Sequence, residues 1–125
     1  MDITEYLSDI LLATAKEDVV FEEANIQYVE ALRAGTLLKA GSTEDELAPA
    51  AKGDTVVGVL IDRRLVLDEA GRVMRARDFT VGTKYPMAVV KTGVTLNKAK
   101  LVYLDKSTIS EEDVEVLKGL GIVAI

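Results

Sequence analysis

The sequence predicts one mainly β domain with one or two short helices and an N-terminal arm, and three observations predict this class. From Gly35 onward, short apolar runs alternate with turn-forming residues, which is typical of a small all-β domain. Hydrophobic residues make up 49% of the 125-residue chain, which is enough for a single core. The segment before Gly35 contains no glycine and carries several acidic clusters, so it differs from the rest.

The N-terminal residues predict a short helix and then an extended segment. One helical face is formed by apolar residues at the spacing i, i+3, i+4, i+7 and i+8, namely Ile3, Tyr6, Leu7, Ile10 and Leu11. Asp2 and Glu5 have the spacing of a capping box. Residues 18–30 mix β-branched and aromatic side chains without a helical period, so we expect them to be extended.

Strands and turns are predicted between Gly35 and residue 104. The apolar runs lie at 36–40, 56–61, 87–91 and 101–104. The breaks at 41–42, 52–54, 70–71, 81–83 and 92–93 each hold a glycine, which tolerates positive φ. Meander-like connections follow from this pattern.

The C-terminal residues predict a helix followed by a last strand. Ser110 precedes three acidic residues at 111–113, as an N-cap does, and Val114 and Leu117 have helical spacing before Gly119. Residues 121–125 are apolar and β-branched, and we expect them to pair as a strand because they would be costly to leave in water.

Composition excludes several functional classes. The chain has no cysteine, histidine or tryptophan, which removes disulfides, thiol nucleophiles, Cys/His zinc sites and histidine-dependent catalysis. Its net charge of −6 has the wrong sign for binding nucleic acid or anionic lipid directly. The acidic opening and the short apolar run at 10–13 do not resemble a secretory signal, so we expect an intracellular, soluble protein.

The remaining candidate sites favour structural roles. The acids at 22–23 and 111–113 are expected on solvated faces and caps, and no calcium or zinc motif is present, so no metal, cofactor or small-molecule substrate is predicted. Gly119 and Gly121 lack the rest of a phosphate loop and are expected to end a helix. The basic residues Arg63, Arg64, Arg72, Arg75 and Arg77 are expected to form inter-subunit ion pairs or a solvated loop, with phosphate binding as the alternative.

The run 58–62 is similar to part of a motif of trimeric dUTP pyrophosphatases, in which an aspartate serves the nucleotide site. The rest of that motif is missing here, so we expect Asp62 to end a buried strand instead. No catalytic residues are predicted. The hypothesis of an enzyme would be revived if the protein turned over a nucleotide with saturation and lost that activity on Asp62→Asn.

Several blocks in order resemble the lambda-like head decoration proteins of tailed bacteriophages. They are 32–38, 47–50 and 54–60, then 88–93, where a strand ends in a Lys-Thr-Gly turn, and finally 117–123, with a helix end, glycine and apolar strand. The resemblance implies a small β-clip or β-tulip-like domain over 32–125 with an N-terminal segment, residues 1–31, outside it. Residues 63–83 look like an insertion relative to the smallest members, and residues 1–31 look more structured than their arms.

The resemblance also implies a function without catalysis. Such proteins bind as homotrimers to the major capsid protein on the outer surface of the expanded virion head, at three-fold and quasi-three-fold sites, and stabilise it against internal DNA pressure. We expect residues 18–28, which can span roughly 35 Å, to add a strand to the capsid protein. The expected capsid-binding residues are Val19, Val20, Phe21, Ile26 and Tyr28. The alternative is another β-rich virion protein or oligomeric adaptor that does not cement capsids.

Overall fold

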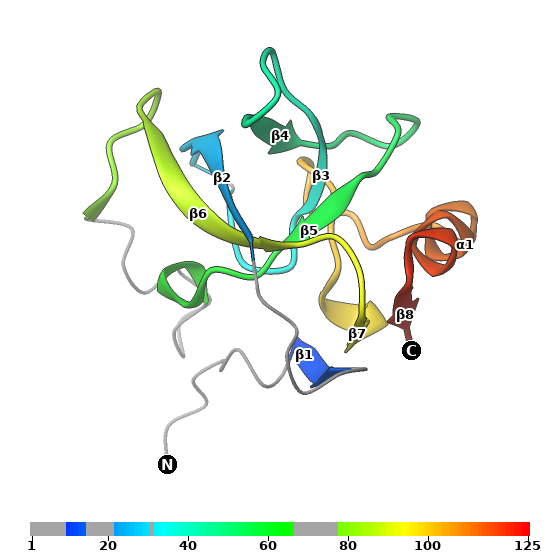
Figure 1. Cartoon of the computed structure of the whole chain (residues 1–125). Coiled ribbons are helices and arrows are strands. Elements are labelled where there is room, and N and C mark those ends of the chain that lie inside the picture. The colour runs from blue at the N-terminus through cyan, green and yellow to red at the C-terminus, as the bar shows by residue number, and fades with distance from the viewer. Residues whose placement is uncertain (1–9, 15–21, 31, 67–77) are drawn as a thin grey trace.

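The computed structural model describes residues 10–14, 22–30, 32–66 and 78–125 as two β-sheets with one α-helix (Figure 1). The strands are β1 (Leu11–Thr14), β2 (Glu22–Gln27), β3 (Leu37–Ala40), β4 (Leu47–Pro49), β5 (Gly58–Leu60), β6 (Lys84–Val90), β7 (Val94–Leu96) and β8 (Ile122–Ala124). The helix is α1 (Glu111–Leu120), and the 3-10 turns include η2 (Arg63–Leu65) and η4 (Lys98–Lys100). The prediction of a mainly β domain is confirmed.

The larger sheet is antiparallel and almost closes on itself. Its strand order is β2-β6-β5-β3-β4, and its longest ladder joins β2 to β6 over six residue pairs. Its two outer strands approach each other, since the Asn25 N–H donates to the Asp45 carbonyl at 2.9 Å and Asn25 bridges to Glu46. Closure of this kind satisfies backbone groups that an open sheet would leave unpaired.

The smaller sheet joins the two ends of the described chain. Its order is β1-β7-β8, with β1 antiparallel to β7 and β8 parallel to it. A parallel neighbour requires a long crossover, and here the crossover contains η4 and α1. In Figure 1, β8 lies at the rim of the molecule beside α1.

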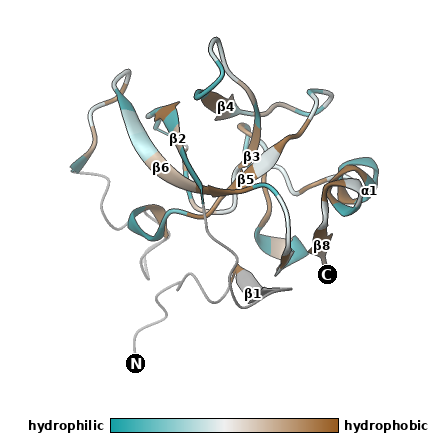
Figure 2. Ribbon diagram, viewed as in Figure 1, coloured by the Kyte–Doolittle hydropathy of each residue, from teal (hydrophilic) through white to brown (hydrophobic). Residues whose placement is uncertain are grey.

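The core is built by alternation along the strands. In β2, Ala24 and Ile26 are buried while the residues between them are exposed, as expected for a strand with one face on the core. β5 is buried throughout, because neighbours cover both its faces. Figure 2 shows the hydrophobic residues of β5, β6 and β3 converging at the centre of the fold.

Gly35 lets two distant segments approach closely. It has φ of +97°, and a Cβ there would lie 2.2 Å from the Lys100 carbonyl oxygen. The Gly35 N–H donates to the Leu60 carbonyl at 2.7 Å, and its carbonyl accepts from the Val102 N–H at 3.1 Å. Only glycine fits this crossing, because any side chain would collide with the backbone.

Tyr103 ties α1 to the domain. Ser110 caps the helix by accepting from the Asp113 N–H, and Gly121, with φ of +92°, ends it. The buried Tyr103 hydroxyl donates to the Asp113 carboxylate and accepts from the Ser110 N–H at 3.1 Å. The helix therefore meets the core through a satisfied polar contact as well as through Leu117.

The local predictions are largely confirmed. Strands occur within or across the runs at 36–40, 56–61 and 87–91, and the C-terminal helix and strand form as predicted. The strand predicted at 101–104 is wrong, because Val102 makes only isolated bridges there. The predicted N-terminal helix lies mostly outside the described residues, and Leu11 at its end belongs to a strand. The strands β1 and β7 were not predicted.

The first 31 residues are not separate from the rest where the structure describes them. β1 pairs with β7 and β2 pairs with β6, so both strands belong to the sheets of residues 32–125. The segment predicted to be extended is a strand over Glu22–Gln27, paired within its own chain.

Replacing Gly35 with alanine is expected to lower the unfolding free energy by about 3 kcal/mol, because backbone strain and a collision with Lys100 act together. Gly53 is a matched control, since it has φ of +101° and nothing within 4 Å of a built Cβ. Gly53→Ala should cost only about 1 kcal/mol of strain. Urea denaturation measures both, and equal losses would contradict the close approach at Gly35.

Replacing Tyr103 with phenylalanine should cost about 1–3 kcal/mol, because the buried Asp113 carboxylate loses its hydroxyl donor. Tyr85→Phe is the control. The Tyr85 hydroxyl accepts from the exposed Thr80 N–H at 2.8 Å, which water can replace, so the loss should stay below about 1 kcal/mol. Thermal unfolding measures the loss of stability in each variant. A loss for Tyr103→Phe that is no larger than the loss for Tyr85→Phe would contradict the dependence of α1 on the Tyr103 contact.

Candidate functional site

The structure places the predicted capsid-binding residues in two groups. Ile26 and Tyr28 are 0% and 5% exposed, so their side chains pack in the core and are not available to a partner in this conformation. Val19, Val20 and Phe21 lie outside the described residues. The side chains that β2 presents outward are polar: Glu23, Asn25 and Gln27, together with Glu22 at its start, are exposed.

An aromatic cluster explains why Tyr28 is buried. Its ring stacks on Phe79 with centroids 5.1 Å apart, and Tyr85 meets Phe79 edge-on at 5.0 Å. The Arg64 guanidinium lies over the Phe79 ring, 5.2 Å from its centroid. Burial first, and then the nearby Glu30 charge, raise the pKa of Tyr28. The cluster therefore joins the segment that follows β2 to the segment that precedes β6.

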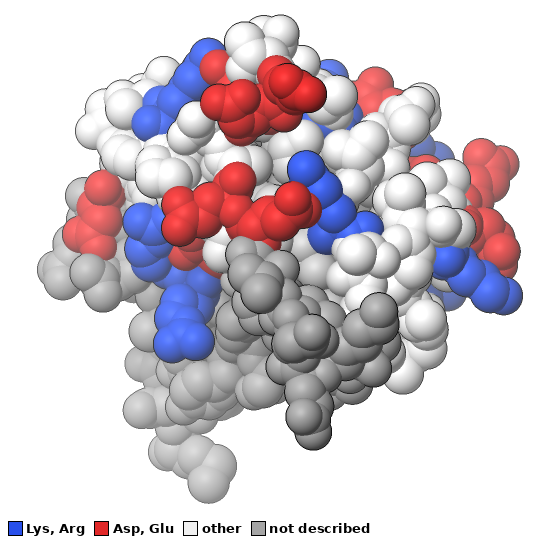
Figure 3. All heavy atoms as spheres, viewed as in Figure 1, with Lys and Arg blue, Asp and Glu red and all other residues white. Residues whose placement is uncertain are grey.

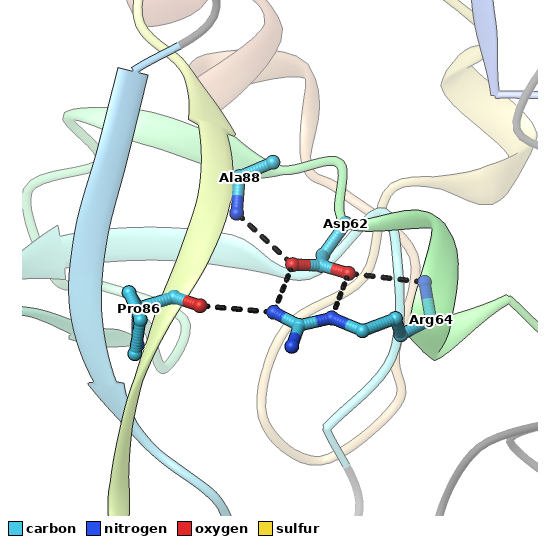
Figure 4. Close-up of polar contacts among 4 residues, drawn as sticks. All are labelled: Asp62, Arg64, Pro86 and Ala88. Atoms are coloured by element: carbon cyan, nitrogen blue, oxygen red, sulfur yellow. Dashed lines mark hydrogen bonds and ion pairs between the residues drawn. The ribbon is translucent and has the colours of Figure 1, made fainter.

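Asp62 lies at the centre of a network of hydrogen bonds that links η2 to β6 (Figure 4). Its carboxylate accepts from the Arg64 N–H at 3.0 Å, from Arg64 Nε at 2.9 Å and from Arg64 Nη2 at 2.7 Å. It also accepts from the Ala88 N–H at 3.1 Å, and Arg64 Nη2 donates onward to the Pro86 carbonyl at 2.9 Å. The side chain thereby continues the β5–β6 ladder beyond Ile61, whose N–H donates to the Ala88 carbonyl.

This environment makes Asp62 a structural residue. Burial on its own raises the pKa of Asp62, but the hydrogen bonds from Arg64 and Ala88 outweigh it, so the pKa is lowered. The carboxylate follows a buried strand, as predicted, and both of its oxygens are occupied by protein donors. Arg63 is exposed beside it, whereas Arg72, Arg75 and Arg77 lie outside the described residues.

The acidic clusters serve as surface charges and caps. Glu22 lies 3.8 Å from Lys91 Nζ, and Glu111 pairs with Lys98. Among the residues that the structure describes, no three carboxylates gather as a metal site would require. The turn at 119–121 ends α1, in agreement with the sequence prediction.

A shallow depression of about 470 Å³ lies beside the start of α1, lined by Lys52–Asp54 and by 110–113. Asp54 accepts from the Ala51 N–H at 2.9 Å and pairs with Lys39, and these contacts lower its pKa. Asp113 is bonded to Tyr103. Asp54 and Asp113 therefore both have partners within the chain.

Exposed apolar residues at the C-terminal end were not predicted. Residues 121–125 were expected to pair as a strand because they would be costly to leave in water. β8 does pair with β7, but Val123 and Ile125 are 46% and 67% exposed. Ile122 is buried, so the strand alternates. The sequence could not indicate which of these side chains would be exposed, because every position of the run is apolar. Only the neighbouring strands decide which face is covered. None of the helices in the described ranges is long and apolar enough to cross a membrane.

Replacing Asp62 with asparagine is expected to lower the unfolding free energy by about 1–3 kcal/mol near neutral pH, because the charge-assisted bonds to Arg64 weaken. The folded pKa of Asp62 lies below the unfolded value of about 3.9. The stabilisation is therefore present above that value and is lost as pH falls through the folded pKa. Urea denaturation between about pH 2 and pH 7 should show the two proteins converging in acid. A difference that stays constant with pH would contradict an ionised Asp62.

Comparison with known proteins identifies the family. The family model described as the bacteriophage PhiTE minor capsid decoration protein matches residues 2–124. No curated protein and no solved structure gives a significant match. The match confirms the resemblance to phage head decoration proteins and covers the strands of both sheets together with α1. The chain therefore belongs to the bacteriophage PhiTE minor capsid decoration protein family, and its place is on the outer surface of the virion capsid.

Proposed function

We propose that the protein cements the expanded phage head: it binds the major capsid protein as a homotrimer at three-fold and quasi-three-fold sites and stabilises the shell against internal DNA pressure. The observation that carries this proposal is the family match, which spans residues 2–124. Capsid decoration is a structural role, and we propose that the protein has no enzymatic activity, cofactor or nucleic-acid partner. The net charge of −6 supports a protein partner rather than a nucleic acid.

The proposed grip is the segment just before β2. Val19, Val20 and Phe21 are apolar and β-branched or aromatic, which suits an added strand at an edge of the capsid protein. Ile26 and Tyr28 then act as anchors, because their burial fixes β2 in the domain. A mechanical force on the segment would therefore act on the ladder of six residue pairs between β2 and β6.

Three such segments on one trimer act together. Once one has docked, the others bind at high effective concentration, and this raises avidity by about 10²–10⁴ without any new type of contact. A protein that binds only the expanded capsid also stabilises that state by mass action. Weak individual segments are therefore sufficient for cementing.

Co-sedimentation with undecorated capsids, before and after expansion, tests the proposed function. We expect saturable binding to expanded shells alone. Absence of binding to either form would overturn cementing and favour a role as an adaptor elsewhere in the virion. Sedimentation velocity of the free protein and the number of copies bound at each capsid site test the trimer. Capsid binding by a protein that is monomeric both in solution and at its sites would overturn it.

The triple variant Val19→Asp, Val20→Asp, Phe21→Asp tests the grip. It should reduce capsid affinity by at least about tenfold, because charges oppose insertion into an apolar edge. The control is Val81→Asp, at a position 64% exposed on the turn before β6. Substitutions are preferred to deletion of residues 1–31, because that deletion would also remove β2 and the buried Ile26. Unchanged binding by the triple variant would contradict the grip.

A further inference from the structure

The outer side of β8 is an open sheet edge. β8 is the last strand of the smaller sheet, and within the part of the chain that the structure describes it pairs only with β7. The edges of the larger sheet, by contrast, meet at Asn25 and Asp45. An unpaired edge displays backbone N–H and C=O groups to which another strand can bond.

The hydrogen bonds of Ile125 fix which groups point outward. Its N–H donates to the Leu96 carbonyl at 3.0 Å, and its carbonyl accepts from the Lys98 N–H at 2.8 Å. Because successive residues of a strand direct their backbone groups to opposite sides, Ala124 turns its N–H and C=O away from β7. Ala124 therefore offers a donor and an acceptor on the outer side of β8, the strand that lies at the rim of the molecule in Figure 1.

Large apolar side chains are exposed on β8 and on the helix that precedes it. The exposed large hydrophobic residues of the described chain number six, and four of them belong to α1 and the β8 segment. They are Val116 (41%), Leu120 (37%), Val123 (46%) and Ile125 (67%). Val116 and Leu120 lie one helical turn apart and so share a face. In Figure 3 the surface at the position of β8 is uncharged.

Other edges carry features that discourage pairing, and β8 does not. β4 contains Pro49, β2 begins with Glu22 and Glu23, and the β1–β7 ladder has a register shift between Leu11 and Ala13. Proline, charges and bulges are the usual means of protecting a sheet edge. An apolar edge without them is typical of a surface that a partner covers.

Charge indicates what kind of partner. On α1, Glu112 and Glu115 are exposed and make no ion pair among the described residues, whereas Glu111 is paired with Lys98. Figure 3 shows acidic atoms at the side where α1 lies, with basic atoms beside them, and α1 itself carries the exposed Lys118 in its last turn. A second copy that docked edge to edge on β8 would bring Glu112 and Glu115 against the same two acids, so pairing of two β8 edges is disfavoured.

We propose that the β8 edge, together with Val116 and Leu120 of α1, binds an extended segment of the capsid protein. The segment pairs its backbone with Ala124, places apolar side chains against Val123 and Ile125, and carries lysine or arginine opposite the acids of α1. This inference rests on the proposed function for the identity of the partner. It adds a second contact, on the opposite sheet from the grip before β2.

Two variants test the edge by co-sedimentation with expanded capsids. Ala124→Pro removes only the outward N–H, which an edge strand tolerates. Val123→Glu places a charge in the apolar surface, and Val81→Glu is its matched control at an exposed valine far along the chain. We expect both edge variants to bind at least about tenfold more weakly, the control to bind as the wild type does, and wild-type binding to weaken with added salt.

The outcomes separate this inference from the proposed function. Wild-type protein that does not bind capsids would overturn the proposed function and, with it, the capsid segment as the occupant. Wild-type binding that Val123→Glu leaves unchanged would overturn the edge alone, even if Ala124→Pro failed to fold by circular dichroism. A change in the oligomeric state of free Val123→Glu protein, with capsid binding intact, would assign the surface to a second copy and also overturn the inference.

Discussion

The pairing of β2 with β6 is the constraint on which the rest of the domain depends. It brings residues near the N-terminus onto the longest strand, and Asn25 then reaches Asp45 to close the larger sheet. The same pairing places Tyr28 against Phe79, and it fixes the side of β6 opposite to the one that Asp62 supports through Ala88. Loss of β2 would therefore open the sheet at two places, because β6 would become an edge and the far side of β4, which stays paired with β3, would lose the bridge to Asn25.

Features set by short-range chemistry could be predicted from the sequence. Ser110, the acids after it and Gly121 define α1 through groups within a few residues of one another, and the glycine-containing turns are local in the same way. Pairing partners were not predictable, since β1 and β8 meet β7 only through tertiary structure. Ile26 and Val123 show the same limit. An apolar side chain looks identical whether it is covered by its own fold or left for a partner.

The two proposed contacts involve both sheets. Along the chain, the segment before β2 follows β1 of the smaller sheet and leads into β2 of the larger one, whereas the β8 edge belongs to the smaller sheet. The acidic character of the chain suits this arrangement, because charge at the rim limits unspecific association while apolar surface supplies affinity. Internal polar groups such as Asp62 and the Tyr103 hydroxyl are satisfied within the chain, so docking does not require them to rearrange.

The pairing of β1 with β7 has a consequence for the lifetime of the folded state. Thr14 pairs with Val94, eighty positions later, so this ladder joins segments that are far apart along the chain. Non-local pairings of this kind slow folding, since the loop-closure entropy must be overcome before any contact is gained. Contacts that form after the transition state slow unfolding instead. Where unfolding is irreversible, the lifetime of a folded protein is set by its unfolding rate rather than by an equilibrium constant, so such a barrier would favour a long-lived folded state.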